Sequence, residues 1–173
     1  VLAGYYPKPK PLAFSAFLSV QNLTGIYSPF TVEANYNQDM TPYNIPFTAC
    51  HELSHLRGFM QEEEANFIAW LACKEAPETE LQYSGSMLAW IHCMNVLYEE
   101  DRAAWSEIRE ILSEEADVDL RANSEFWDKW DGAVAEVSEQ INDNYLKANG
   151  QKDGVQSYGR MADLVVAYYL WEE

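Results

Sequence analysis

Basic residues are scarce in this chain. Only 11 of its 173 residues are lysine or arginine, against 28 aspartates and glutamates, and the formal net charge at pH 7 is -17. Such a chain lacks the positive surface that binds nucleic-acid phosphates or anionic lipid headgroups. We therefore expect neither a nucleic-acid partner nor direct contact between this surface and a membrane.

Cysteine is also rare, and long apolar runs are missing. Cys50, Cys73 and Cys93 are odd in number and lie in apolar helical contexts, which favours buried free thiols over a disulfide framework. The sequence contains no signal peptide and no apolar run of roughly 18 residues. Its hydrophobic content of 48% and aromatic content of 14% are those of a globular protein, and its length predicts a single domain over residues 1–173.

Histidine occurs only three times, and two of the three stand close together in the run His51-Glu52-Leu53-Ser54-His55. Residues four apart share one face of a helix, so both imidazoles can reach a single metal ion. Glu52 is then placed beside that ion as a general base. The motif predicts a Zn²⁺ site and the activity of a zinc metallopeptidase, a hydrolase.

A catalytic zinc ion usually takes three protein ligands, so one more ligand is needed. Glu62, Glu63 and Glu64 follow in the acidic first turn of the next predicted helix. We expect Glu62 to be the third ligand, with Glu63 as the alternative. The longer metzincin motif fails at Gln61, where a third histidine is required and a neutral amide is a poor zinc ligand. His92 is expected on a helix face or in the core rather than at the metal.

The apolar periodicity predicts a mainly α chain with a small β element, an α+β fold. Pro46 in the first turn, Asn44 as a possible cap and Gly58 as a stop delimit the helix that carries the two histidines. We expect an extended lead-in at 5–11, a strand at 29–37, and helices at about 12–22, 46–58, 62–75, 80–99, 101–113, 124–145 and 158–171.

Four blocks of the sequence, residues 25–37, 46–55, 62–67 and 157–163, together resemble the bacterial domain of unknown function 3810 family. That family is a group of zincin-like metallopeptidases, so the resemblance implies a zincin-like domain with an HExxH active-site helix. Its members typically carry membrane-spanning helices ahead of this domain, whereas this chain begins at Val1 without them. We therefore expect the soluble part of a longer, membrane-anchored protein, with this domain outside the cytoplasm.

Resemblance also implies roles for individual residues. The segment from Glu62 to Asn66 is similar to the Glu-x-x-(Ala or Ser)-Asp element of the glutamate-liganded zincins, the gluzincins, whose acidic residue binds zinc. Asn66, which stands where the gluzincins have aspartate, would then support a ligand histidine. By analogy with zincins, the backbone of Ala34 and Asn35 would pair with a peptide substrate.

The last predicted helix begins near Tyr158 and Arg160, inside the fourth block. Either side chain could donate a hydrogen bond to the oxyanion of the reaction, with Tyr158 preferred and Arg160 as a substrate clamp.

The predicted function is hydrolysis of a peptide or protein substrate by a metal-activated water molecule. The alternative is a zinc-stabilised, catalytically inactive binding or scaffold module of the cell envelope, but such a module does not need a base such as Glu52.

Overall fold

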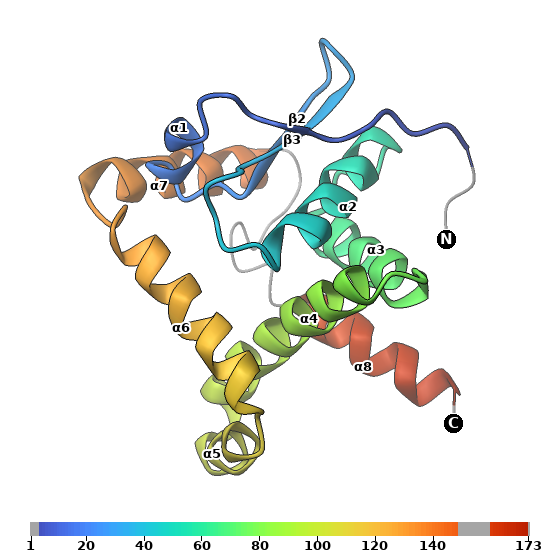
Figure 1. Cartoon of the computed structure of the whole chain (residues 1–173), viewed down its shortest axis with the longest axis vertical. Helices are drawn as coiled ribbons and strands as arrows, with labels where there is room; N and C mark the ends of the chain where they lie inside the picture. Colours follow the sequence, from blue (N-terminus) through green and yellow to red (C-terminus); the bar gives the residue numbers. More distant parts are fainter. Residues whose placement is uncertain (1–3, 149–159, 173) are drawn as a thin grey trace.

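The computed structural model describes residues 4–148 and 160–172, and in this part of the chain it contains eight helices and three short strands (Figure 1). The strands are β1 (Lys10–Pro11), β2 (Gly25–Ser28) and β3 (Glu33–Tyr36). The helices are α1 (Ala16–Ser19), α2 (Asn44–Leu56), α3 (Glu62–Glu75), α4 (Thr79–Glu100), α5 (Arg102–Glu110), α6 (Glu114–Asp128), α7 (Ala133–Ala148) and α8 (Arg160–Glu172). The mainly helical α+β class predicted from the sequence is confirmed.

The small sheet has the order β1-β3-β2, with β3 in the centre. β2 and β3 form an antiparallel hairpin, and β1 pairs with β3 in parallel. The predicted strand at 29–37 is therefore too long, because residues 29–32 form the turn of the hairpin. Pro29 has no N–H for a ladder and Val32 has a positive φ of 55°, so the extended backbone resumes only at Glu33.

Two of the predicted helices are also wrong. The helix expected at 12–22 is reduced to the four residues of α1, and Asn22 with a φ of 55° is incompatible with its continuation. The helix expected from Ser124 onward is split between α6 and α7, with Gly132 in the break. α6 begins much earlier than predicted because the Ser113 hydroxyl accepts a hydrogen bond from the Ala116 N–H and so caps its first turn.

Helix α2, which carries both histidines of the motif, begins two residues earlier than predicted. Its N-cap position is Tyr43, and Asn44 lies inside the helix instead of capping it. The Asn44 amide donates hydrogen bonds to the Thr41 hydroxyl and to the Asn123 side-chain oxygen on α6. These contacts attach the start of α2 to α6. At the other end the helix stops as predicted, because Gly58 adopts a φ of 92°.

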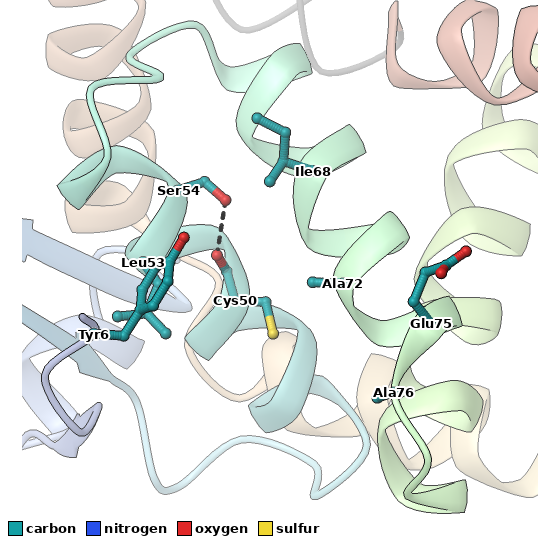
Figure 2. A pocket seen from close by; sticks show the side chains of 8 residues that line it. All are labelled: Tyr6, Cys50, Leu53, Ser54, Ile68, Ala72, Glu75 and Ala76. Atoms are coloured by element: carbon teal, nitrogen blue, oxygen red, sulfur yellow. Dashed lines mark hydrogen bonds between the residues drawn. The ribbon is translucent and has the colours of Figure 1, made fainter. Parts of the chain in front are cut away.

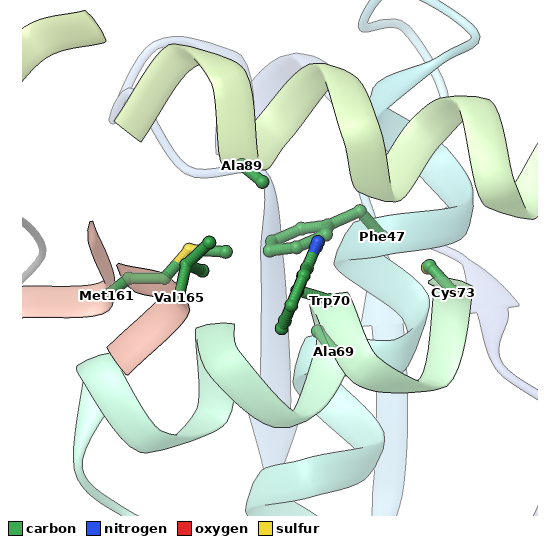
Figure 3. Close-up of a cluster of buried hydrophobic side chains, with 7 residues drawn as sticks. All are labelled: Phe47, Ala69, Trp70, Cys73, Ala89, Met161 and Val165. Carbon is green, nitrogen blue, oxygen red and sulfur yellow. The ribbon is translucent and has the colours of Figure 1, made fainter. Parts of the chain in front are cut away.

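A buried apolar cluster fixes α2 against its neighbours. Its members come from α2, α3, α4 and α8, and they are Phe47, Ala69, Trp70, Cys73, Ala89, Met161 and Val165 (Figure 3). In Figure 1, α2 and α3 lie at the centre of the molecule, with the β2–β3 hairpin on one side and α4 and α8 on the other. Across residues 4–148 and 160–172, none of the helices has both the length and the apolar character needed to cross a membrane.

The sheet approaches α2 most closely at Gly25. A Cβ atom at this position would lie 2.5 Å from Oε1 of Glu52, 2.7 Å from Cγ2 of Thr48 and 2.9 Å from the carbonyl oxygen of Asn35. Real Cβ atoms essentially never approach other atoms so closely, and the Asn35 carbonyl belongs to the backbone. Only glycine therefore allows β2 to lie directly against the motif helix.

We predict that Gly25→Ala lowers the free energy of unfolding by about 1–3 kcal/mol, the usual cost of overpacking. The measurement is denaturant unfolding followed by circular dichroism. Gly132→Ala is the matched control, because a Cβ atom there meets nothing within 4 Å. Equal stabilities for the two variants would contradict the close approach of β2 to α2.

Candidate metal centre

Three side chains converge where α2 meets the start of α3. One ligand atom from each of His51, His55 and Glu62 lies within 4.8 Å of the other two. The Glu62 carboxylate lies between the two imidazoles, with Oε2 at 3.3 Å from Nε2 of His51 and Oε1 at 3.7 Å from Nε2 of His55. Two imidazole nitrogens and a carboxylate oxygen form a set that suits a zinc ion, and such a group could hold one.

The backbone explains why these residues meet. His51 and His55 are one helical turn apart on the inner face of α2. Gly58 then reverses the chain, and α3 begins at Glu62, so the first carboxylate of the new helix returns to the two histidines. Glu63 does not belong to this group, and Glu64 is exposed. Among the three candidate glutamates, the geometry thus favours Glu62.

The outer nitrogen of each imidazole is held by an oxygen acceptor. Nδ1 of His51 lies 2.7 Å from Oδ1 of Asn66, and Nδ1 of His55 lies 2.8 Å from the carbonyl oxygen of Phe59. An oxygen acceptor at Nδ1 places a proton there, so that Nε2 of each neutral ring would be the nitrogen available to a metal ion. Asn66 thus lies at the position inferred from the gluzincin resemblance. Phe59 was not predicted, because a backbone carbonyl leaves no trace in the side-chain pattern.

Glu52 is buried in the same site, with only 5% of its surface exposed. Burial raises the pKa of its carboxyl to about 7, while the charge of His51 opposes this shift and that of Glu62 adds to it. Burial also lowers the pKa of His55, and the charge of His51 lowers it further. Burial lowers the pKa of His51 as well. The hydrogen bond to Glu62 and the charges of Glu52 and Glu62 outweigh this effect, so the pKa of His51 is raised overall. The buried carboxylate of Glu52, the half-buried carboxylate of Glu62 and two imidazoles form an environment that a divalent cation would neutralise.

The candidate metal centre lies in a cleft of about 1010 Å³. Residues 21–27, which include most of β2, form one wall. The motif residues of α2, and Glu62 and Asn66 of α3, also line the cleft, together with His92 of α4 and Ser138 and Asn142 of α7. The sequence pattern placed His92 on a helix face but gave no sign that this face borders the site.

Other residues predicted for the site lie elsewhere. Ala34 and Asn35 are on the central strand, where Asn35 pairs with Ile26 of β2 and with Lys10 of β1. The sheet edge that borders the cleft belongs to β2, and neither Ala34 nor Asn35 lines the cleft. Arg160 is exposed at the first residue of α8 and is not among the residues that line the cleft. Tyr158 lies outside the described residues, so its predicted role stays a prediction.

Comparison with known proteins identifies the family. The model of the family described as a protein of unknown function, DUF3810, matches residues 1–166, and the chain belongs to that family. This match confirms the resemblance seen in the four sequence blocks. No curated protein and no solved structure matches the chain significantly.

We predict that the purified chain binds one zinc ion and that Glu62→Gln weakens this binding far more than Glu63→Gln does. Both variants replace one carboxylate of the same helical turn, but only the Glu62 carboxylate lies between the histidines. Zinc competition against a chromophoric chelator measures both affinities, with His51→Ala as the variant expected to lose binding. A larger loss of zinc affinity in Glu63→Gln than in Glu62→Gln would show that Glu63 is the third ligand.

Removal of the Asn66 side chain, which holds the His51 ring, should reduce zinc affinity less than loss of a ligand does. We predict that Asn66→Ala reduces zinc affinity by about 10–100-fold, because the His51 ring loses the acceptor that fixes its proton and direction. Asn66→Asp restores an oxygen at the same position and should preserve zinc binding. The same titration measures both variants, and an Asn66→Ala affinity equal to that of the parent chain would exclude this role.

Proposed function

We propose that this chain is a zinc-dependent peptidase of zincin-like, gluzincin type. The observation that carries the proposal is the convergence of His51, His55 and Glu62 in one cleft, with the buried carboxylate of Glu52 next to His51 on the same helix. A purely structural metal site does not need a fourth ionisable group beside its ligands. An enzyme that transfers a proton needs such a group as its general base.

Each residue has a role in this proposal. His51, His55 and Glu62 would hold the zinc ion, and the bound ion would supply a Lewis acid that activates water and polarises the peptide carbonyl. The Glu52 carboxylate accepts a proton from the attacking water and passes it to the leaving amine. Its buried position in the cleft, between the two histidines along α2, suits this task.

The substrate proposed for this site is an extended peptide. Within the described part of the chain, β2 pairs with β3 along one edge, and no strand pairs with its other edge. Gly25 brings β2 against Glu52, so a peptide paired with the outer edge of β2 would place its backbone near the base. Backbone pairing of this kind accepts varied side chains. Other residues that line the cleft, including His92 and Asn142, are then the ones that would determine side-chain preference.

We predict that Glu52→Gln keeps the fold and zinc affinity but lowers peptide hydrolysis by about 10²–10⁴-fold, since only the proton transfer is removed. Cleavage of a peptide library, followed by mass spectrometry, measures the activity. Glu64→Gln is the matched control, because Glu64 is an exposed carboxylate on the first turn of α3. Equal activity of the parent chain and Glu52→Gln would exclude Glu52 as the base. A zinc-loaded parent chain that cleaves no peptide would favour the binding or scaffold module.

A further inference from the structure

Two of the three thiols face each other between α2 and α3. The Sγ atom of Cys73 donates a hydrogen bond to Sγ of Cys50 over 3.9 Å. Cys73 has no exposed surface, whereas Cys50 is half-buried. The third thiol, Cys93, also contacts the core cluster but has no thiol partner among the described residues. The pair therefore combines one reachable sulfur with one sequestered sulfur.

A pocket leads to the reachable sulfur. It has a volume of about 330 Å³, and its walls include Cys50 and Leu53 of α2 and Ile68 and Ala72 of α3. Figure 2 shows the Cys50 sulfur in the space between these two helices. A water molecule occupies about 30 Å³ in the liquid, so the pocket admits small oxidants. Cys50 and Leu53 lie on the face of α2 opposite the metal-ligand face.

We propose that Cys50 and Cys73 form an oxidation site that closes to a disulfide when the protein meets hydrogen peroxide. In the first step the Cys50 sulfur attacks one peroxide oxygen, the O–O bond breaks, and Cys50 becomes a sulfenic acid with release of water. In the second step the Cys73 sulfur attacks the Cys50 sulfur, the S–O bond breaks, and a second water leaves as the disulfide forms. One peroxide molecule thereby gains the two electrons that the two thiols lose.

The geometry allows the second step with small movements. A disulfide has an S–S length of about 2.05 Å, so the two sulfurs must approach by about 2 Å from their present separation of 3.9 Å. The bond would join α2 to α3 immediately before His51 and on the helix that carries Glu62. Oxidation would thus tie together the two helices that hold the candidate metal centre. The oxidation site itself does not depend on the proposed peptidase activity.

The test uses the reduced full chain, treated with hydrogen peroxide and then alkylated. We expect the number of alkylatable thiols to fall from three to one. Proteolytic mapping should show a peptide in which Cys50 is linked to Cys73, with Cys93 alkylated. Full alkylation of Cys50 and Cys73 after treatment would overturn the proposal, as would a disulfide that involves Cys93. A parent chain that stops at singly oxidised Cys50 would also overturn it.

Variants separate the roles of the two sulfurs. Cys93→Ser should lose both remaining thiols to the same linkage. Cys73→Ser should stop at the sulfenic acid of Cys50, which dimedone traps, and Cys73→Ala is the second choice if the serine variant does not fold. Cys50→Ser should leave Cys73 alkylatable under denaturing conditions, because the oxidant no longer meets a reachable sulfur. Oxidation of Cys73 in Cys50→Ser would contradict the assignment of Cys50 as the entry point.

Discussion

The position of the Glu62 carboxylate between two imidazoles is the constraint on which the rest of this structure depends. Charges that are largely removed from water are costly unless they are paired, so α2 and α3 must hold these groups in contact. Phe47 and Trp70 supply the apolar contact that fixes the two helices, and the Ser84 hydroxyl from α4 accepts a hydrogen bond from the Phe47 N–H. This packing therefore holds α2 and α3 in the positions at which Glu62 meets the two imidazoles.

The two sides of α2 carry different chemistry. One side presents the imidazoles and Glu52 to a cleft of about 1010 Å³, and the other presents the Cys50 thiol to a pocket of about 330 Å³. Four residues on one helical turn, Cys50, His51, Glu52 and Leu53, point to different surroundings because each successive residue turns by about 100°. A change in the position of this turn is therefore felt on both sides. The thiol of Cys50 and the candidate metal ligand His51 therefore share one helical turn.

The sequence predicted most of the candidate site and less of the fold around it. The spacing of His51 and His55 and the acidic run at Glu62 depend on helix geometry alone, and α3 occupies the predicted residues. The strand β2 was missed because a four-residue strand that begins with glycine gives almost no alternation of apolar and polar residues. Edge and centre positions in a sheet depend on pairing between distant segments, so the central location of Asn35 could not be foreseen.

The chain reverses at Gly58, so the number of residues between α2 and α3 determines where Glu62 lies relative to the two histidines. Residues 57–61 are not helical, so one residue added there or removed would change the span of this connection by up to about 3.3–3.6 Å. A connection of another length would have to displace Glu62 from the imidazoles or shift α3, and with it the core contacts of Trp70. Insertions and deletions should therefore be excluded from residues 57–61 among proteins that share this centre.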